Sequence, residues 1–377
     1  MVFLAALVGR ELAQRLRLPT VIGEIALGCV VGPSVLGWIS PTAPLEALAE
    51  LGAVLLLFAA GLETRLGELK KVGKVAIAVG VGGVVLPFLM GVLWARLMGH
   101  PTPQALFIAA AFVATSAGIT ARVLSDLGML GRVESRIILG AAVIDDILAM
   151  LLLSSVTAIQ GGGGVDLAGL SLVLVKAVGF VVLTALLGTQ LMKCKGSELL
   201  DAPRDPLSSL ALSLLLCLGL AAAAHFLGLA AIIGAFLAGV LVAETRQQHT
   251  LRTQLEPLMS FLVPFFFVVT GTKVALAQLG STNALGMLAV ATLLAMVSKL
   301  LACGLGAWSL GKHSALIIGV GMIPRGEVGI IVASLGQAAG VFNVQLYAVI
   351  IAMSLLTSLI APLALKPLLV KENDVTD

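Results

Sequence analysis

Two adjacent carboxylates, Asp145 and Asp146, lie inside an apolar run from Ile137 to Ile159 whose only other polar side chains are hydroxyls. A charged side chain at the centre of a bilayer costs about 2.5 to 3.5 kcal/mol on insertion scales. Two in succession are therefore retained only where they face a polar cavity or a charged partner. The pair predicts a proton or cation site.

Composition indicates that this run crosses a membrane. Fifty-nine per cent of the residues are hydrophobic, 11 per cent are charged, and the mean hydropathy is +1.11, whereas soluble domains contain about 25 per cent charged residues. The net charge of +3 is small. It is typical of loops that meet anionic lipid and gives no reason to expect a nucleic-acid partner.

Apolar stretches long enough to span about 30 Å of hydrocarbon recur along the whole chain. They predict thirteen helices at 1–17, 20–39, 45–62, 72–98, 102–125, 133–159, 166–192, 206–227, 229–245, 255–273, 283–310, 313–337 and 343–369. The expected fold is thus an all-α polytopic membrane protein of about thirteen transmembrane helices.

The connections between these helices alternate in charge. Lys and Arg gather at 15–17, 65–74, 122–136, 193–204, 246–252, 312 and 366–371, whereas the loops at 38–45, 160–167 and 337–344 are nearly free of them. Basic loops stay on the cytoplasmic side of membranes. We therefore expect the C-terminus in the cytoplasm and the N-terminus outside.

Short sequence matches indicate an internal repeat. The stretch from Leu45 to Gly61 aligns with that from Leu255 to Gly271 at an offset of 210 residues, and Ile22–Gly28 aligns with Ile233–Gly239 at 211. This offset spans seven helices, an odd number, so the two copies must have opposite orientations in the membrane. Two inverted six-helix repeats, bridged by the helix at 166–192, are the architecture of many secondary transporters.

The repeat pairs two helices that both contain interruptions. Helix 102–125 contains Ala114-Thr115-Ser116-Ala117-Gly118, and helix 313–337 contains Pro324 between Gly321 and Gly326. Proline and glycine weaken a helix and free backbone groups, which bind ions at membrane depth. We expect two interrupted helices, with Thr115 and Ser116 as additional oxygen ligands.

The remaining charges inside predicted spans need partners or an interface. Successive residues on a helix point about 100° apart, so one aspartate can pair with a cation from another helix, for which Lys299 is the natural choice, while the other faces a cavity. Arg325 and Glu327 are expected to compensate the ends of the broken helices. Lys176 is interpreted as snorkelling to the interface, and Glu24 as an interfacial residue near the cytoplasm.

Three segments, 114–124, 135–146 and 321–329, together with the opening motif at 18–24, resemble the bacterial monovalent cation:proton antiporters, and among them the electrogenic sodium/proton antiporters. The resemblance covers essentially the whole chain. It implies a homodimer in the bacterial inner membrane and two interrupted helices that cross beside the aspartates. It implies as well that Asp146 is the cation- and proton-binding carboxylate while Asp145 pairs with Lys299.

The resemblance also implies a division into a scaffold and a core. The dimerisation or scaffold parts would be 1–62 and 206–273, the core transport parts 72–159 and 283–369, with a linker helix at 166–192 and a cytoplasmic tail at 370–377. Such a protein is a transporter and not an enzyme, needs no cofactor, and has Na⁺, H⁺ and membrane lipid as its partners.

A mechanism follows from the residue types. Burial disfavours the charged forms of a carboxylate and of a lysine, so both can exchange protons near neutral pH. Sodium, a hard cation, prefers oxygen ligands, and competition between Na⁺ (or Li⁺) and protons at Asp146 would drive exchange. If Lys299 also releases a proton, two protons exchange for one sodium and transport is electrogenic.

Other function classes stay open from the sequence. A potassium/proton antiporter of the same fold, a sodium-coupled solute symporter and a non-transporting membrane sensor each fit the architecture. No Gly-x-x-x-x-Gly-Lys-Ser/Thr sequence is present, so nothing supports an ATP-driven pump.

Overall fold

The computed structural model describes residues 1–16, 18–64, 66–160, 167–193, 206–245, 248–273 and 279–370, and all its long regular elements in these ranges are helices. The predicted all-α membrane class is confirmed. The helices are α1 (Val2–Arg15), α2 (Thr20–Val31), α3 (Ala43–Leu62), α4 (Leu66–Leu97), α5 (Thr102–Val113), α6 (Ala117–Asp126), α7 (Val133–Gln160), α8 (Leu167–Lys193), α10 (Pro206–Phe226), α11 (Ala231–Val242), α12 (Gln248–Thr272), α13 (Thr282–Gly306), α14 (Lys312–Gly321), α15 (Gly326–Ala338) and α16 (Val344–Val370), with a short 3₁₀ turn at Trp308–Leu310.

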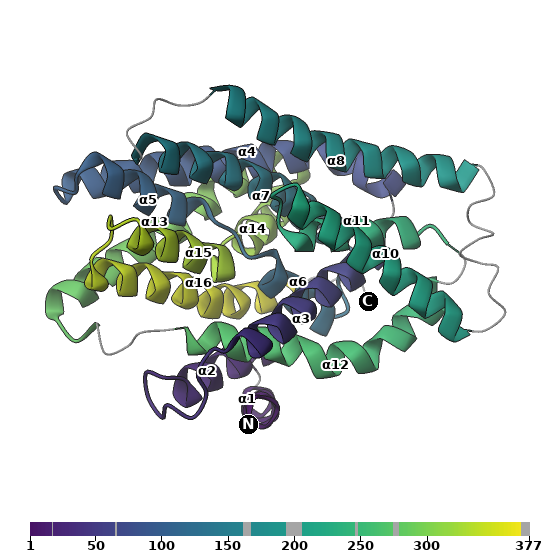
Figure 1. The fold of residues 1–377 in the computed structure, drawn as a ribbon, viewed down its shortest axis with the longest axis horizontal. Helices are drawn as coiled ribbons and strands as arrows, with labels where there is room; N and C mark the ends of the chain where they lie inside the picture. The colour runs from purple at the N-terminus through teal and green to yellow at the C-terminus, as the bar shows by residue number, and fades with distance from the viewer. Residues whose placement is uncertain are drawn as a thin grey trace.

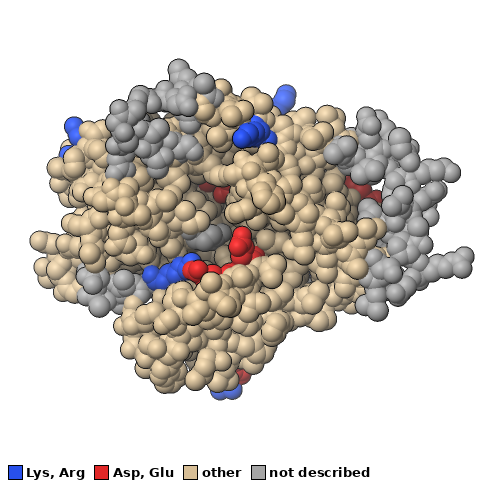
Figure 2. Space-filling view, viewed as in Figure 1, with Lys and Arg blue, Asp and Glu red and all other residues tan. Residues whose placement is uncertain are grey.

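Within the described ranges, seven helical segments are long and apolar enough to cross a membrane. Large apolar side chains point outward on several helices, for example Leu89 of α4, Leu183 of α8, Leu215 of α10 and Leu293 of α13. Most of the surface in Figure 2 is uncharged, as expected of a surface in contact with lipid. The total of thirteen crossings stays a prediction.

Both predicted interruptions are present. The chain leaves the helix after Val113 and re-enters it at Ala117, and it leaves again after Gly321 and re-enters at Gly326. Gly326 has a φ of +44°, in the left-handed region that favours glycine. One corrected boundary is that of α2, predicted to reach residue 39, which ends at Val31 because Gly32 is extended before Pro33.

Glycines of the predicted repeat make close backbone contacts between helices. A Cβ added at Gly61 of α3 would lie 2.2 Å from the Phe236 carbonyl oxygen, and one at Gly239 of α11 would lie 2.1 Å from that of Phe58. Gly28 of α2 and Gly271 of α12 face one another in the same way, at 2.3 and 2.2 Å from carbonyl oxygens. The second contact is related to the first by the offsets of 211 and 210 residues that the repeat predicts.

Two groups of helices can be followed in Figure 1. Helices α5, α13, α15 and α16 lie together on one side, α10 and α11 on the other, and α12 runs along the lower edge beside α1 and α2. Helix α4 packs against α5, α7 and α13, whereas α3 packs against α11 and α12. Contacts between the groups include those of α6 with α2 and α3.

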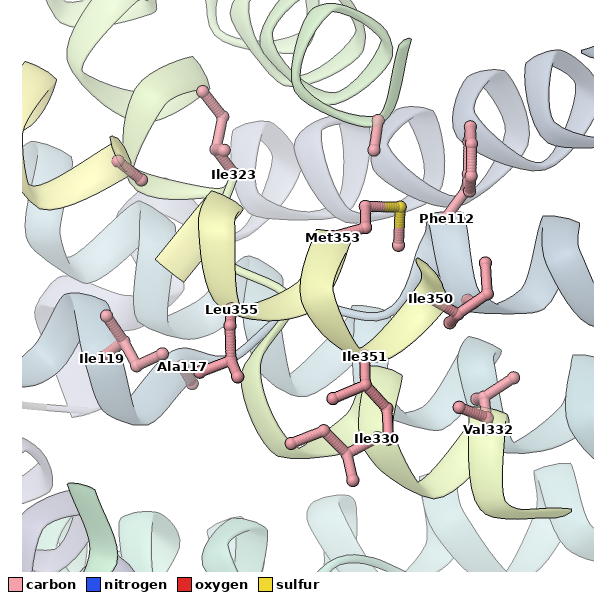
Figure 3. Close-up of a cluster of buried hydrophobic side chains, with 14 of the residues drawn as sticks. Phe112, Ala117, Ile119, Ile323, Ile330, Val332, Ile350, Ile351, Met353 and Leu355 are labelled. Atoms are coloured by element: carbon pink, nitrogen blue, oxygen red, sulfur yellow. The ribbon is translucent and has the colours of Figure 1, made fainter. Parts of the chain in front are cut away.

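Buried aliphatic and aromatic side chains fill the space around the broken helices. Phe112 of α5, Ile119 of α6, Ile330 of α15 and Met353 of α16 belong to one cluster (Figure 3), and each is at most 6 % exposed. This dense packing holds the crossing of the two broken helices in place.

Some predicted features lie outside the described residues. They are most of the connections at 160–167 and 193–204, and residues 371–377 of the tail. The division into core, scaffold and linker is not tested by the fold alone and stays a prediction.

Candidate cation and proton site

The centre of the candidate site is an ion pair between α7 and α13. The Nζ atom of Lys299 lies 2.8 Å from Oδ1 of Asp145, and both side chains are completely buried. The sequence predicted this partner for one of the two aspartates. Removing either member would leave a buried charge without compensation, which typically costs about 3 to 5 kcal/mol.

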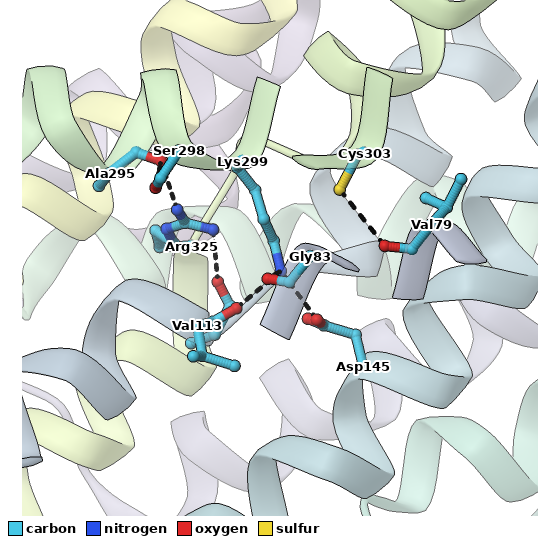
Figure 4. A network of polar contacts seen from close by, with 10 residues as sticks. Val79, Gly83, Val113, Asp145, Ala295, Ser298, Lys299, Cys303 and Arg325 are labelled. Atoms are coloured by element: carbon cyan, nitrogen blue, oxygen red, sulfur yellow. Dashed lines mark hydrogen bonds and ion pairs between the residues drawn. The ribbon is translucent and has the colours of Figure 1, made fainter. Parts of the chain in front are cut away.

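Lys299 is also bonded to two backbone carbonyls. Its ammonium donates to the oxygen of Gly83 in α4 at 2.7 Å and to that of Val113, the last residue of α5, at 2.9 Å (Figure 4). The sequence analysis missed both carbonyls. Pro87 was the available signal for the first, because a proline four residues after Gly83 removes the N–H that would bond its carbonyl.

Asp146 is placed differently from its neighbour. It lines a cavity of about 320 Å³ between α5, α7, α15 and the start of α11, together with Ala110, Met150, His225 and Val328. Its side chain retains 6 % of its exposure, whereas Asp145 retains none. One carboxylate therefore faces a lysine and the other a cavity, as their angular separation on α7 requires.

Thr115 and Ser116 lie in the break between α5 and α6, just beyond the carbonyl that Lys299 binds. The Ser116 N–H donates to the Pro324 carbonyl at 2.7 Å, which joins the two breaks directly. The Thr115 hydroxyl is buried and has no hydrogen-bond partner among the described residues. The Thr115 hydroxyl oxygen is therefore available to coordinate a cation.

Arg325 holds the ends of two helices. Its guanidinium donates to the Ala114 carbonyl at 3.1 Å and to the Ala295 carbonyl of α13 at 2.6 Å, and its side chain is fully buried. The cation thus lies at the C-terminus of α5, where the helix dipole is negative. Glu327 is in the first turn of α15, and its side chain lies outside the described part of the chain.

Hydroxyl groups from neighbouring helices cap the other broken ends. Thr357 and Ser358 of α16 accept from the backbone N–H groups of Arg325 and Gly326, at 3.3 and 3.2 Å. The Thr120 hydroxyl donates to the carbonyl of Gly321 at 2.6 Å. The capping role of these residues was not predicted, because serine and threonine in an apolar helix usually only pack against their neighbours.

The two remaining charged residues of the predicted spans differ in their exposure to solvent. Lys176 is exposed on α8, and snorkelling to the interface stays a prediction. Glu24 is completely buried and pairs with Arg10 of α1 at 3.2 Å, and its position at the membrane interface stays a prediction. Nearby, the Thr20 hydroxyl of α2 donates to Asp126 at the end of α6, so a polar cluster joins α1, α2 and α6.

Comparison with known proteins gives one family. A model described as the transmembrane sodium/hydrogen exchanger matches residues 2–371. The Na(+)/H(+)-K(+) antiporter GerN of Bacillus cereus is 35 % identical over 373 residues, covering 97 % of this chain and 94 % of that protein. The high-affinity Na(+)/H(+) antiporter NhaS3 of Synechocystis is 35 % identical over 401 residues, covering 96 % of this chain and 87 % of that protein.

The fold is shared with a solved archaeal structure. The sodium proton antiporter MjNhaP1 from Methanocaldococcus jannaschii at pH 8 superposes with a TM-score of 0.64, covering 96 % of this chain and 94 % of that one, at 19 % sequence identity. At this level of identity the likeness concerns the fold.

Proposed function

This chain belongs to the sodium/hydrogen exchanger family, and on that premise we propose that it exchanges Na⁺ or Li⁺ for protons at Asp146. The chain is an integral membrane antiporter and not an enzyme. Asp146 binds the cation, two protons are exchanged for each Na⁺, and a core domain moves relative to a scaffold.

The observation that carries the assignment is the different environment of the two aspartates. Asp146 borders a cavity of about 320 Å³, whereas Asp145 is bonded to Lys299. An oxygen ligand next to a cavity can bind either a proton or a hard monovalent cation, and the two compete for the same lone pairs. Thr115 and Ser116, at the break beside the site, would supply further oxygens.

Lys299 provides the second proton in this proposal. When Na⁺ binds at Asp146, the Asp145 carboxylate turns toward the cation and leaves Lys299, and the desolvated ammonium then loses one proton. Asp146 has lost the other. One Na⁺ is thus exchanged for two H⁺, and each cycle moves one net charge across the membrane.

Alternating access requires movement of one part of the chain against the other. We assign the moving core to 72–159 and 283–369, the scaffold to 1–62 and 206–273, and the linker to 166–192, with 370–377 as a cytoplasmic tail. The two helix breaks are joined by the hydrogen bond from Ser116 to Pro324. This bond supports a core that moves as one rigid body across the membrane against a fixed scaffold, which is an elevator mechanism.

The same proposal includes assembly and location. The chain forms a homodimer in a bacterial inner membrane, with its N-terminus outside and its C-terminus in the cytoplasm. The outward apolar side chains of α1, among them Leu4, Leu7 and Leu12, suit contact with lipid or a second copy.

Potassium is the second candidate substrate. The name of GerN, one of the relatives, includes potassium beside sodium, and a carboxylate with hydroxyl and carbonyl oxygens can bind either ion. A sodium-coupled symporter is less well supported, because the matched family and the relatives named above are antiporters.

Proton flux in proteoliposomes tests the proposal. A pH-sensitive dye is enclosed, Na⁺, Li⁺ or K⁺ is added, and the membrane potential is clamped with valinomycin in the sodium and lithium experiments. Sodium- or lithium-driven flux that responds to the potential is expected. Flux driven by K⁺ alone and indifferent to the potential would instead indicate electroneutral potassium exchange.

Two variants identify the carboxylate. Asp146→Asn is expected to abolish exchange while the protein still inserts and folds, because the amide cannot take up a proton. Glu50→Gln, which neutralises an exposed carboxylate on α3, is the matched control and should retain full flux. Full cation-dependent flux in Asp146→Asn would show that the site lies elsewhere.

A further inference from the structure

The ammonium group of Lys299 has one oxygen acceptor for each of its three hydrogens. These are Oδ1 of Asp145 at 2.8 Å, the Gly83 carbonyl at 2.7 Å and the Val113 carbonyl at 2.9 Å, contributed by α7, α4 and α5 (Figure 4). An ammonium group has three donors and no acceptor. The lysine therefore sits in a complete cradle of oxygens, all of them out of contact with solvent.

Both carbonyls are made available by the chain itself. Pro87 lies inside α4, four residues after Gly83, so the Gly83 oxygen has no N–H from the following turn. Val113 is the last residue of α5, and residues 114–116 are not helical, so its oxygen is one of the free carbonyls of a helix end. The two interruptions aim oxygens at one point whether or not a lysine occupies it.

The size and charge of the cradle suit a large monovalent cation. Oxygens surround Mg²⁺ at about 2.0 to 2.1 Å and Ca²⁺ at about 2.3 to 2.6 Å, both shorter than the distances to Nζ. In potassium channels, backbone carbonyl oxygens of the selectivity filter replace the hydration shell of the ion. A single carboxylate balances a single positive charge, so ammonium and potassium fit best.

Two further observations concern the surroundings of the ammonium group. Oδ2 of Asp145 is buried and has no hydrogen-bond partner in the described part of the chain, so the carboxylate has a fourth oxygen to offer. A Cβ at Gly83 would lie 2.9 Å from the Cys303 sulfur and 3.2 Å from Nζ. Glycine at this position therefore lets the α4 backbone approach the ammonium closely.

We infer that Asp145, with the Gly83 and Val113 carbonyls, forms a second monovalent-cation site of potassium or ammonium size, which Lys299 fills as a cation tethered to the chain. This site does not include Asp146, but it shares Asp145 with the proposed exchange, in which that carboxylate leaves Lys299 when Na⁺ binds. Removal of the lysine side chain vacates it for a free cation.

The test measures thermal unfolding of the purified full-length Lys299→Ala variant in choline chloride, with KCl, NH₄Cl, NaCl or LiCl replacing part of the choline. K⁺ and NH₄⁺ are expected to raise the unfolding midpoint in a saturable manner, because a ligand that binds only the folded state stabilises it. Lys299→Met, whose side chain fills the same space without charge, is the matched control and should show no such shift.

Two double variants separate this site from Asp146. The potassium shift should survive in Lys299→Ala with Asp146→Asn, and disappear in Lys299→Ala with Asp145→Asn. If Asp146→Asn abolishes the shift, potassium was bound at Asp146; the second site is then refuted while the proposed exchange stands.

Other results would also overturn the inference. Equal midpoints in choline, KCl and NH₄Cl would show that no cradle of this size exists, and so would a larger shift with Na⁺ or Li⁺ than with K⁺ in Lys299→Ala with Asp146→Asn, where the proposed sodium site is removed. If Lys299→Ala does not fold in choline, Lys299→Ser is used with the same salts. Failure of potassium and ammonium to restore folding of either variant would refute the site, because a bound cation must relieve the unpaired Asp145.

Discussion

The replacement Lys299→Gln tests whether the buried lysine carries one of the exchanged protons. Glutamine is similar in length, but its neutral amide offers two N–H donors to a cradle of three acceptors. An ionised Asp145 would then be buried without a cation, at a cost of about 3 to 5 kcal/mol. We therefore expect Asp145 to keep a proton throughout the cycle and the variant to exchange one proton for one sodium.

The magnitude of the expected effect follows from the charge moved. One net charge crossing a potential of about 100 mV is worth about 2.3 kcal/mol, and each 1.4 kcal/mol is a factor of ten in an equilibrium ratio. Clamping about 100 mV across wild-type proteoliposomes should thus change the equilibrium sodium ratio roughly 40- to 50-fold. For Lys299→Gln the ratio should not respond to the potential.

The assay is equilibrium sodium distribution under a valinomycin clamp, with the internal pH fixed. Lys176→Gln, which neutralises an exposed lysine on α8, is the matched control and should respond as wild type does. A Lys299→Gln variant that keeps the full 40- to 50-fold response would refute the reasoning, because the second proton would then travel without Lys299.

Three further predictions concern the frame of the site. Gly61→Ala places a Cβ 2.2 Å from the Phe236 carbonyl and should lower stability by about 1 to 3 kcal/mol, whereas Gly179→Ala, with open space around it, should not; a thermal-unfolding series in which both behave alike would contradict the packing. Arg325→Met removes the side-chain donor from the buried Ala114 carbonyl, at about 1 to 3 kcal/mol, while the Ala295 carbonyl still accepts from Ser298; both the unfolding midpoint and the flux should fall, and an unchanged midpoint would refute its bridging role. Ser358→Ala removes a cap from α15 and should cost roughly 1 kcal/mol, which Ser358→Thr should largely recover in the same measurement.

The sequence was sufficient for those parts of the site that depend on rare residue types. Proline and glycine around residue 324 predicted one helix break, and the repeat carried that prediction to Thr115 and Ser116. A lysine in an apolar run predicted the partner of one aspartate, because few other cations were available at that depth. Charged residues and helix-breaking residues cost free energy inside a membrane, so their presence in an apolar run indicates a specific role.

The parts that could not be predicted depend on three-dimensional contacts of ordinary groups. Every residue has a carbonyl, so only the fold shows that those of Gly83 and Val113 meet at one lysine. The ion pair of Glu24 with Arg10 was not predicted, because Arg10 lies on a separate helix and no spacing rule connects the two residues. The capping hydroxyls of α16 were missed for the same reason.

The paired glycines have a mechanical consequence. Where Gly61 meets Gly239 and Gly28 meets Gly271, main chain touches main chain, so no side chain is present that could change rotamer and let the helices slide. Helices α2, α3, α11 and α12 are therefore expected to move together as one rigid unit when a force acts on any of them. Helices can slide more easily where side chains lie between them, as Thr20 and Asp126 do where α2 meets α6.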